Sequence, residues 1–299
     1  MQTLLITTSP ETNSNALLLD KSKFLDKHDQ DKLEIAFYDD FAILMNSDGA
    51  QVLHPKLLLD DFKRVIFRNS INNWIMGYGI GYMAKKLGLS LSSDRMSVLD
   101  PIENKLAQTL LFNELVTNIR LPKTMYLQSW NDFGTKCVHE NFKFPFVVKA
   151  DTGMKGNDNF LVENEADFST VREKLTREII IQEYIENVGD YRVLYVGLGS
   201  PPLIFHRSSD RDTYLNNTSQ GATATVTEDL PNWLIDDSKS IAQHMGFDIV
   251  GLDLMESSVS GEWYFIEANA TPALLSGEFT TQKAAMLTRY INENNNSDE

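Results

Sequence analysis

The sequence has 299 residues, 42% of them hydrophobic and 23% charged, which is typical of a globular protein of about two domains. Acidic residues outnumber basic ones 42 to 27, and the formal net charge of −15 argues against nucleic acid or an anionic membrane as a partner. The single cysteine, Cys137, excludes an internal disulfide, and no apolar run approaches the ~20 residues of a membrane-spanning helix. The N-terminal MQTLLITTSPE lacks the features of a secretory signal, so the expected location is cytoplasmic.

The first part of the chain alternates short apolar runs with helical patterns. Strands are predicted at residues 3–8, 33–38 and 64–69, and helices at 15–27 and 73–87. Strands separated by helices indicate βαβ units and a parallel sheet. The sequence after the first strand, TTSPETNSN, is not a glycine-rich dinucleotide fingerprint, so a Rossmann cofactor site is disfavoured.

From residue 100 onward the pattern becomes α+β. A first group of elements predicts a small subdomain: a helix at 103–116, strands at 123–127, 144–150 and 160–163, a helix at 165–175 and a strand at 179–184. A second group predicts a larger antiparallel sheet covered by one helix: strands at 191–197, 203–207, 247–255 and 263–268, and a helix at 230–245.

Two of these C-terminal strands carry acidic and amide side chains. In GLDLM, Asp253 points away from its apolar neighbours, and in FIEANATP, Glu267 and Asn269 share one face. If the strands pair around a turn near residues 257–261, three oxygen donors lie on one rigid surface, which suits Mg²⁺. The alternative is the solvated outer face of a hairpin.

A lysine next to a glycine-bearing loop is a candidate phosphate site. Lys149 ends the apolar strand FPFVV, and Gly153 and Gly156 follow in DTGMKGND. Loop N–H groups and a lysine can together contact phosphate oxygens, although the spacing is not that of a Walker motif and an ordinary hairpin turn is the alternative. Lys105, in the helix after Pro101, is a second candidate cation or a solvated helix residue.

The segment IIIQEYIENVGDYRV places Glu183 at the end of a strand and Asp190 beyond a short loop. This arrangement would offer hinge contacts to a purine and a carboxylate to ribose hydroxyls. The alternative is a polar linker between two sheets.

In this order along the chain, these residues resemble the ATP-grasp superfamily over roughly residues 97–293. The resemblance implies a mixed α/β (α+β) fold in which two α+β subdomains enclose ATP, preceded by a small N-terminal parallel βα domain. It implies nucleotide contacts from Lys105, Lys149, Gly153, Gly156, Gln182, Glu183, Tyr184, Ile185 and Asp190. It also implies that Asp253, Glu267 and Asn269 bind Mg²⁺, two ions being the expected number and Mn²⁺ an alternative.

Within the superfamily, the segments RVIFRNS…YGIGYMAKKLGL, ENKL and LPKT resemble the RimK-type ligases, which join an amino acid to a carboxylate. In FHRSSDRDTYLNNTSQGATA, Arg207 and Asn217 occupy positions that the resemblance assigns to contact with the reacting phosphate. Arg192 is predicted to hold a substrate carboxylate, with a surface strand position as the alternative. His206 is predicted to face away from Arg207, and Arg68 and Arg211 to be structural.

The predicted activity is ATP-dependent amide formation through an acyl phosphate. The acceptor is an amino acid, a peptide or a protein tail, and a homo-oligomer is left open. Two alternatives remain: a macrocyclase that cross-links a precursor peptide, and a small-molecule kinase of related fold. The predicted domains are 1–96 and 97–299, the latter divided into 97–182, 183–293 and a frayed tail at 294–299.

Overall fold

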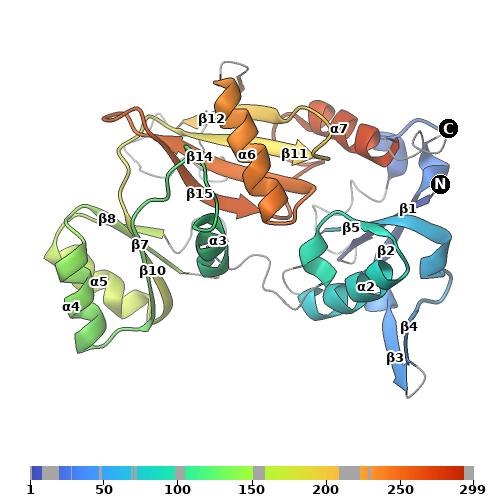
Figure 1. Cartoon of the computed structure of the whole chain (residues 1–299), viewed down its shortest axis with the longest axis horizontal. Coiled ribbons are helices and arrows are strands. Elements are labelled where there is room, and N and C mark those ends of the chain that lie inside the picture. Colours follow the sequence, from blue (N-terminus) through green and yellow to red (C-terminus); the bar gives the residue numbers. More distant parts are fainter. Residues whose placement is uncertain are drawn as a thin grey trace.

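The computed structural model describes residues 2–8, 20–27, 29–46, 49–68, 70, 73–97, 105–150, 159–208, 223–227 and 230–292. Its fold is mixed α/β, with one parallel and several antiparallel sheets (Figure 1). No helix in the described part of the chain is long and apolar enough to cross a membrane. The predicted boundaries after residues 96 and 182 stay predictions, and the tail at 294–299 lies outside the described residues.

The N-terminal region is built on a four-stranded parallel sheet. Its order is β2-β1-β5-β6, with bounds Leu33–Phe37, Gln2–Thr7, Phe62–Phe67 and Ser90–Leu91. The three predicted strands and the helix α2 (Trp74–Lys86) are confirmed. Of the helix expected at 15–27, the described part contains only a 3₁₀ turn at Lys21–Lys23. Further 3₁₀ turns are Gln30–Lys32, Tyr38–Asp40, Leu59–Asp61 and Asp94–Ser97.

The sequence analysis missed a hairpin of this region. Strands β3 (Ala42–Asn46) and β4 (Gly49–Leu53) pair with each other and extend away from the parallel sheet in Figure 1. Its alternation is too short to separate it from a loop by pattern alone.

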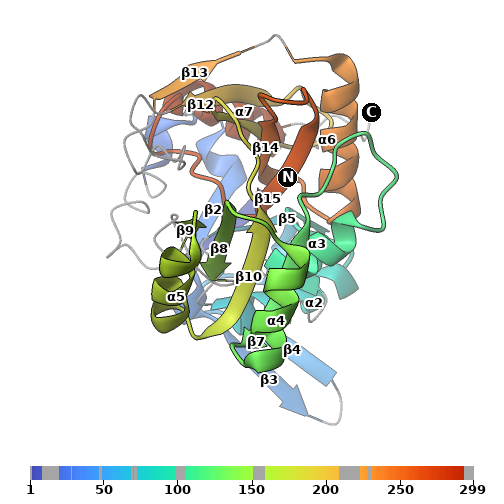
Figure 2. The same cartoon turned by 90° about the vertical axis from the view of Figure 1, so that its left-hand side faces the viewer.

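The central sheet is antiparallel and covered on one face by two helices (Figures 1 and 2). Its order is β7-β10-β8-β9, with bounds Thr124–Ser129, Arg177–Glu183, Phe146–Ala150 and Asn159–Val162. Phe146 and Val148 pack with side chains of α4 (Asp132–Asn141) and α5 (Glu165–Lys174). Alternation along β8 therefore puts Lys149 on the opposite face.

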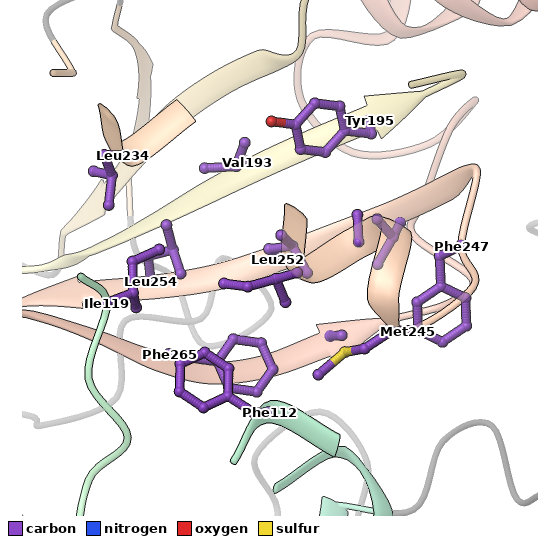
Figure 3. Packing of buried hydrophobic residues seen from close by; sticks show 14 of the residues in the cluster. Phe112, Ile119, Val193, Tyr195, Leu234, Met245, Phe247, Leu252, Leu254 and Phe265 are labelled. Carbon is purple, nitrogen blue, oxygen red and sulfur yellow. The ribbon is translucent and has the colours of Figure 1, made fainter. Parts of the chain in front are cut away.

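The C-terminal sheet has five antiparallel strands in the order β13-β12-β11-β14-β15. Their bounds are Thr223–Val226, Leu203–Ser208, Asp190–Val196, Ile249–Glu256 and Trp263–Asn269. One face packs against α6 (Asn232–His244) and α3 (Lys105–Phe112). Figure 3 shows this core, in which the rings of Phe112 and Phe265 stack with centroids 4.8 Å apart. The helix expected at 103–116 ends at Phe112.

The other face of this sheet is divided between apolar and polar residues. Leu194, Val196 and Ile249 pack against α7 (Thr280–Asn292), a helix that the sequence analysis did not predict. The same cluster includes Leu5 and Ile66 of the parallel sheet, so α7 links the N-terminal and C-terminal sheets. The rest of the face carries the polar residues of the candidate site.

Candidate active site

The β14–β15 hairpin brings the predicted acidic residues together. Asp253 is the register partner of Glu267, and Gly251 is the partner of Asn269, so both pairs lie on one face as expected. The register shifts between Asp253 and Leu254, next to this pair. Because of this bulge, Phe265 and Ala268 both join the core although they are three residues apart.

The side-chain ends of Asp253, Glu267 and Asn269 converge. Asn269 Nδ2 lies 3.4 Å from Asp253 Oδ2 and 3.2 Å from Glu267 Oε1. Two carboxylates and an amide within this distance fit Mg²⁺ once the amide presents its oxygen, which needs only a rotation of the amide plane. In the described residues no cluster of three or more His, Cys, Asp or Glu side chains could hold a metal, so the amide is needed to complete this donor set.

Two arginines from neighbouring strands bind Asp253. Arg192, its register partner on β11, donates from Nε to Oδ1 and from Nη2 to Oδ2, the latter at 2.7 Å. Arg207 Nη2 lies 2.9 Å from Asp253 Oδ1, and Arg207 Nε lies 2.5 Å from Asp190 Oδ1. The four side chains form one network of alternating charge, in which Arg192 faces Asp253 rather than solvent.

The network determines the ionisation of its carboxyl groups. Burial opposes ionisation of Asp253, but Arg192 and Arg207 outweigh it and lower its pKa. Burial raises the pKa of Asp190 to about 7, with Arg207 opposing and Asp253 adding to the shift. Arg207 stays charged, since Asp253 and Asp190 raise its pKa against the effect of burial.

Lys149 reaches this network from the central sheet. It is 7% exposed, and burial lowers its pKa to about 8, while Glu267 and Asp253 raise it and Lys105 lowers it. These interactions show that Lys105, Lys149 and the acidic hairpin share one electrostatic environment. The Lys149 ammonium group forms no hydrogen bond or ion pair with a described residue, so a buried cation is left for an anion to neutralise.

The predicted hinge residues lie at the end of β10. Gln182 shares the face of Lys149 and donates to Thr124 Oγ1 at 3.1 Å. Glu183 instead accepts the Lys123 backbone N–H at 3.2 Å. Ile185 is buried, and burial, together with Glu186 and Glu163, raises the pKa of Tyr184.

Asp190 follows a loop that must approach β12 closely. Gly189 has φ +147°, and a Cβ there would lie 2.3 Å from His206 Nε2 and 2.5 Å from the Arg207 carbonyl oxygen. Only glycine permits this approach, which brings Asp190 beside Arg207. His206 faces the other way and contacts the ring of Tyr191, with centroids 4.7 Å apart, as predicted.

Some predicted residues cannot be located, and one residue at the site was missed. Gly153, Gly156 and Asn217 lie outside the described residues. The missed residue is Lys283 of α7, whose pKa burial lowers to about 8, with Arg192 and Arg68 lowering it further and Glu278 raising it. The sequence feature that could have identified it is a lysine at a position where the helical pattern of α7 expects an apolar residue.

A separate pocket of about 420 Å³, lined by Trp233, Trp263 and others, contains none of the predicted site residues.

Comparison with known proteins identifies relatives of this architecture. A family model described as the RimK-like ATP-grasp domain matches residues 103–294. No curated protein sequence matches the chain.

Several solved structures have the same fold over nearly the whole chain. A Chryseobacterium gregarium RiPP-associated ATP-grasp ligase, in complex with ADP and a leader and core peptide, is 16% identical with a TM-score of 0.67, covering 98% of this chain and 97% of that one. The macrocyclase MdnC from Microcystis aeruginosa MRC, bound with precursor peptide MdnA, is 13% identical with a TM-score of 0.64, covering 98% and 100%. The VanG D-Ala:D-Ser ligase from Enterococcus faecalis is 12% identical with a TM-score of 0.66, covering 97% and 98%.

Proposed function

The chain belongs to the RimK-like ATP-grasp family, and on this premise we propose that it is an ATP-dependent ligase that joins a carboxylate to an amine. The observation that carries the proposal is the meeting of buried Lys149 with the network of Asp253, Arg192, Arg207 and Asp190. Buried cations beside paired carboxylates are suited to holding phosphates and a developing negative charge.

The proposed reaction has two steps. An oxygen of the substrate carboxylate attacks the γ-phosphorus of ATP, and the bond to ADP breaks, giving an acyl phosphate. The amine nitrogen then attacks the acyl carbon, phosphate leaves with the bonding electrons, and the amine loses a proton to give the amide. Both steps need reactants held in line and negative charge neutralised, which is the contribution of the protein.

Each side chain has a proposed role in this scheme. Lys105 and Lys149 bind the phosphates of ATP, and Arg207 binds the transferring phosphoryl group from a position locked by two carboxylates. Arg192 orients the substrate carboxylate. Asp253, Glu267 and Asn269 would hold Mg²⁺, with two ions proposed, and when bound it neutralises charge on the phosphates. Gln182–Ile185 and Asp190 are proposed to contact the nucleoside, and Gly153, Gly156 and Asn217 the phosphates.

A second candidate uses the same chemistry inside a precursor peptide, forming ester or amide cross-links. It is supported by likeness to two ligases whose solved structures contain precursor or leader and core peptides. The D-Ala:D-Ser ligase is as similar in fold, so the likeness does not choose between them. A kinase of related fold would stop after phosphoryl transfer.

The experiment is ADP release measured against a panel of carboxylates, with and without amines, followed by mass spectrometry. Hydroxylamine is added to trap an acyl phosphate as a hydroxamate. A ligase gives ADP, phosphate and an amide only when both substrates are present. A phosphorylated product that is stable to amines would indicate the kinase, and loss of one water per link from a peptide would indicate the macrocyclase.

A further inference from the structure

Gln108 is a buried polar side chain at the place where α3 meets β15, and it is 6% exposed. Its Nε2 donates to the carbonyl oxygen of Ala268 at 2.8 Å, and its Oε1 accepts the backbone N–H of the same residue at 2.9 Å. A side-chain amide carries the same donor and acceptor as a peptide group. Gln108 therefore binds Ala268 in the way that a neighbouring strand would.

β15 is the last strand of the C-terminal sheet, and its outer edge is covered at two places. At the first, the N–H of Arg120 donates to the Trp263 carbonyl oxygen at 2.7 Å, and the Arg120 carbonyl oxygen accepts the Phe265 N–H at 2.8 Å. Beyond the bulge, at Ala268, the partner is the side chain of Gln108 instead. The glutamine thus completes the edge between the two proposed metal ligands of this strand.

The two hydrogen bonds hold the peptide planes on both sides of Ala268. Its N–H belongs to the planar unit shared with Glu267, and its C=O belongs to the unit shared with Asn269. Holding both planes limits backbone rotation next to each of these residues, and so constrains the directions in which their side chains project. Replacing groups that orient metal ligands typically lowers metal affinity.

Gln108 also fixes the helix that carries Lys105. An isolated helix of 8 residues is marginal in water, so the position of α3 depends on its packing against β15 (Figure 1). Gln108 and Phe112, four residues apart on one face, both contact this strand, the latter by stacking on Phe265. Lys105 is the first residue of the helix, one turn before Gln108, and its charge acts on Lys149. One side chain therefore links a proposed phosphate-binding lysine to the proposed metal site.

We propose that Gln108 is a positioning residue of the active site, which orients Glu267 and Asn269 for Mg²⁺ through the backbone of Ala268 and holds Lys105 in register with them. This inference rests on the proposed ligase function and adds to it a residue that touches neither substrate nor metal. A side chain that only fills space could be replaced by methionine, which has a similar shape, without any effect on metal binding. The two roles therefore predict different outcomes for one substitution.

The first measurement is Mn²⁺ binding to the complex with ADP, followed by the electron paramagnetic resonance of free Mn²⁺, which needs no turnover. Gln108→Met should weaken Mn²⁺ binding by about 10- to 100-fold. Gln108→Asn keeps the amide on a side chain one methylene shorter, and its affinity should lie between those of Gln108→Met and the wild type. Gln243→Met is the matched control, because it makes the same change at an exposed position of α6 and should bind Mn²⁺ as the wild type does.

Two further measurements separate positioning from general destabilisation. In Gln108→Met, hydrogen exchange followed by mass spectrometry should be faster in peptides that cover residues 263–269 and unchanged in those that cover β11. In a double-mutant cycle, Gln108→Met should lower Mn²⁺ affinity less in Glu267→Gln than in the wild type, because one of the ligands that it orients has already been removed. In the ligase reaction, the Mg²⁺ concentration for half-maximal ADP release should rise by a larger factor than kcat falls at saturating Mg²⁺.

Two results would overturn the inference. One is a folded Gln108→Met, checked by circular dichroism, that keeps the wild-type affinity for Mn²⁺. The other is an equal loss of affinity in the wild-type and Glu267→Gln backgrounds, which would assign Gln108 to general stability. If Gln108→Met does not fold, the same criteria apply to Gln108→Asn. These results come from binding, so they are distinguished from a wild type that releases no ADP with any substrate pair, which would refute the ligase function itself.

Discussion

Asp253 faces Arg192 across the β11–β14 pair, and the two side chains meet at two points, with Arg192 Nη2 2.7 Å from Asp253 Oδ2. Arg207 binds the same carboxylate at 2.9 Å. Because both arginines hold the pKa of Asp253 low against the effect of burial, this group stays ionised at neutral pH. One charged carboxylate therefore links two candidate catalytic arginines to the proposed metal site.

Replacing Glu267 tests the metal site. Glu267→Gln removes one carboxylate charge with little change in volume, so the protein should fold while ATP turnover falls by about 100-fold or more at saturating Mg²⁺. The measurement is steady-state ADP release. Glu262→Gln is the control, since Glu262 lies on the same hairpin in an exposed ion pair with Arg120. A wild-type rate for Glu267→Gln would remove this residue from the proposed metal ligands.

Lys149 should strengthen ATP binding and lower the stability of the ligand-free protein. Lys149→Met should weaken ATP binding, and the difference from wild type should grow at low ionic strength, where charge interactions are least screened. Without ligand, the variant should have a higher melting temperature and a free energy of unfolding at pH 7 that is larger than that of the wild type by at most about 3 kcal/mol. The reason is that burying the ammonium group of Lys149 destabilises the folded wild type. Calorimetric titration and thermal melts check the two effects. Lys143→Met, at an exposed position before β8, should change neither.

The pH dependence of Lys149 has opposite signs for folding and binding. The pKa of Lys149 is about 8 in the folded chain against its ordinary value of 10.5, so the unfolded chain binds more protons between these two values. The Lys149 contribution to stability therefore rises with pH through this window. ATP binding needs the ammonium form, so affinity should fall above about pH 8, by at most about tenfold per pH unit, with proton uptake. Titrations in buffers of different ionisation enthalpy measure the uptake. Equal uptake in Lys149→Met would assign it to another group.

Arg207 should matter more for rate than for ATP affinity. Arg207→Lys keeps the charge but loses the planar fork, so kcat should fall about 100- to 1000-fold with a small change in Kd for ATP. Arg207→Met leaves Asp190 and Asp253 without this partner and should destabilise the fold by about 3–5 kcal/mol. Single-turnover ADP formation and denaturant unfolding are the measurements. Arg177→Lys, at an exposed strand position, serves as the control, and wild-type single-turnover kinetics in Arg207→Lys would contradict the assignment.

The local pattern of apolar and polar residues was sufficient to predict those helices and strands whose own side chains determine their structure. The predicted strands of the parallel and C-terminal sheets and helix α2 follow from apolar periodicity, and the hairpin that pairs Asp253 with Glu267 follows from alternation around a short turn. The β3–β4 hairpin and α7 were missed. The apolar stripe of α7 includes Lys283, and the helix is stabilised by packing between two sheets that are far apart in sequence.

The sequence by itself determined the family resemblance, the alternation of α and β elements, and which face of each strand carries polar side chains, because a period of two fixes that face whatever the neighbours are. Only the tertiary structure decided which charges meet. The strand order puts β11 between β12 and β14, so Arg192 reaches Asp253 and Arg207 bridges Asp253 to Asp190. Contacts between distant segments likewise bring Lys149, Lys283 and Arg68 to this region. No local pattern contains this information, since the energy of a buried charge depends on partners that the chain contributes from elsewhere.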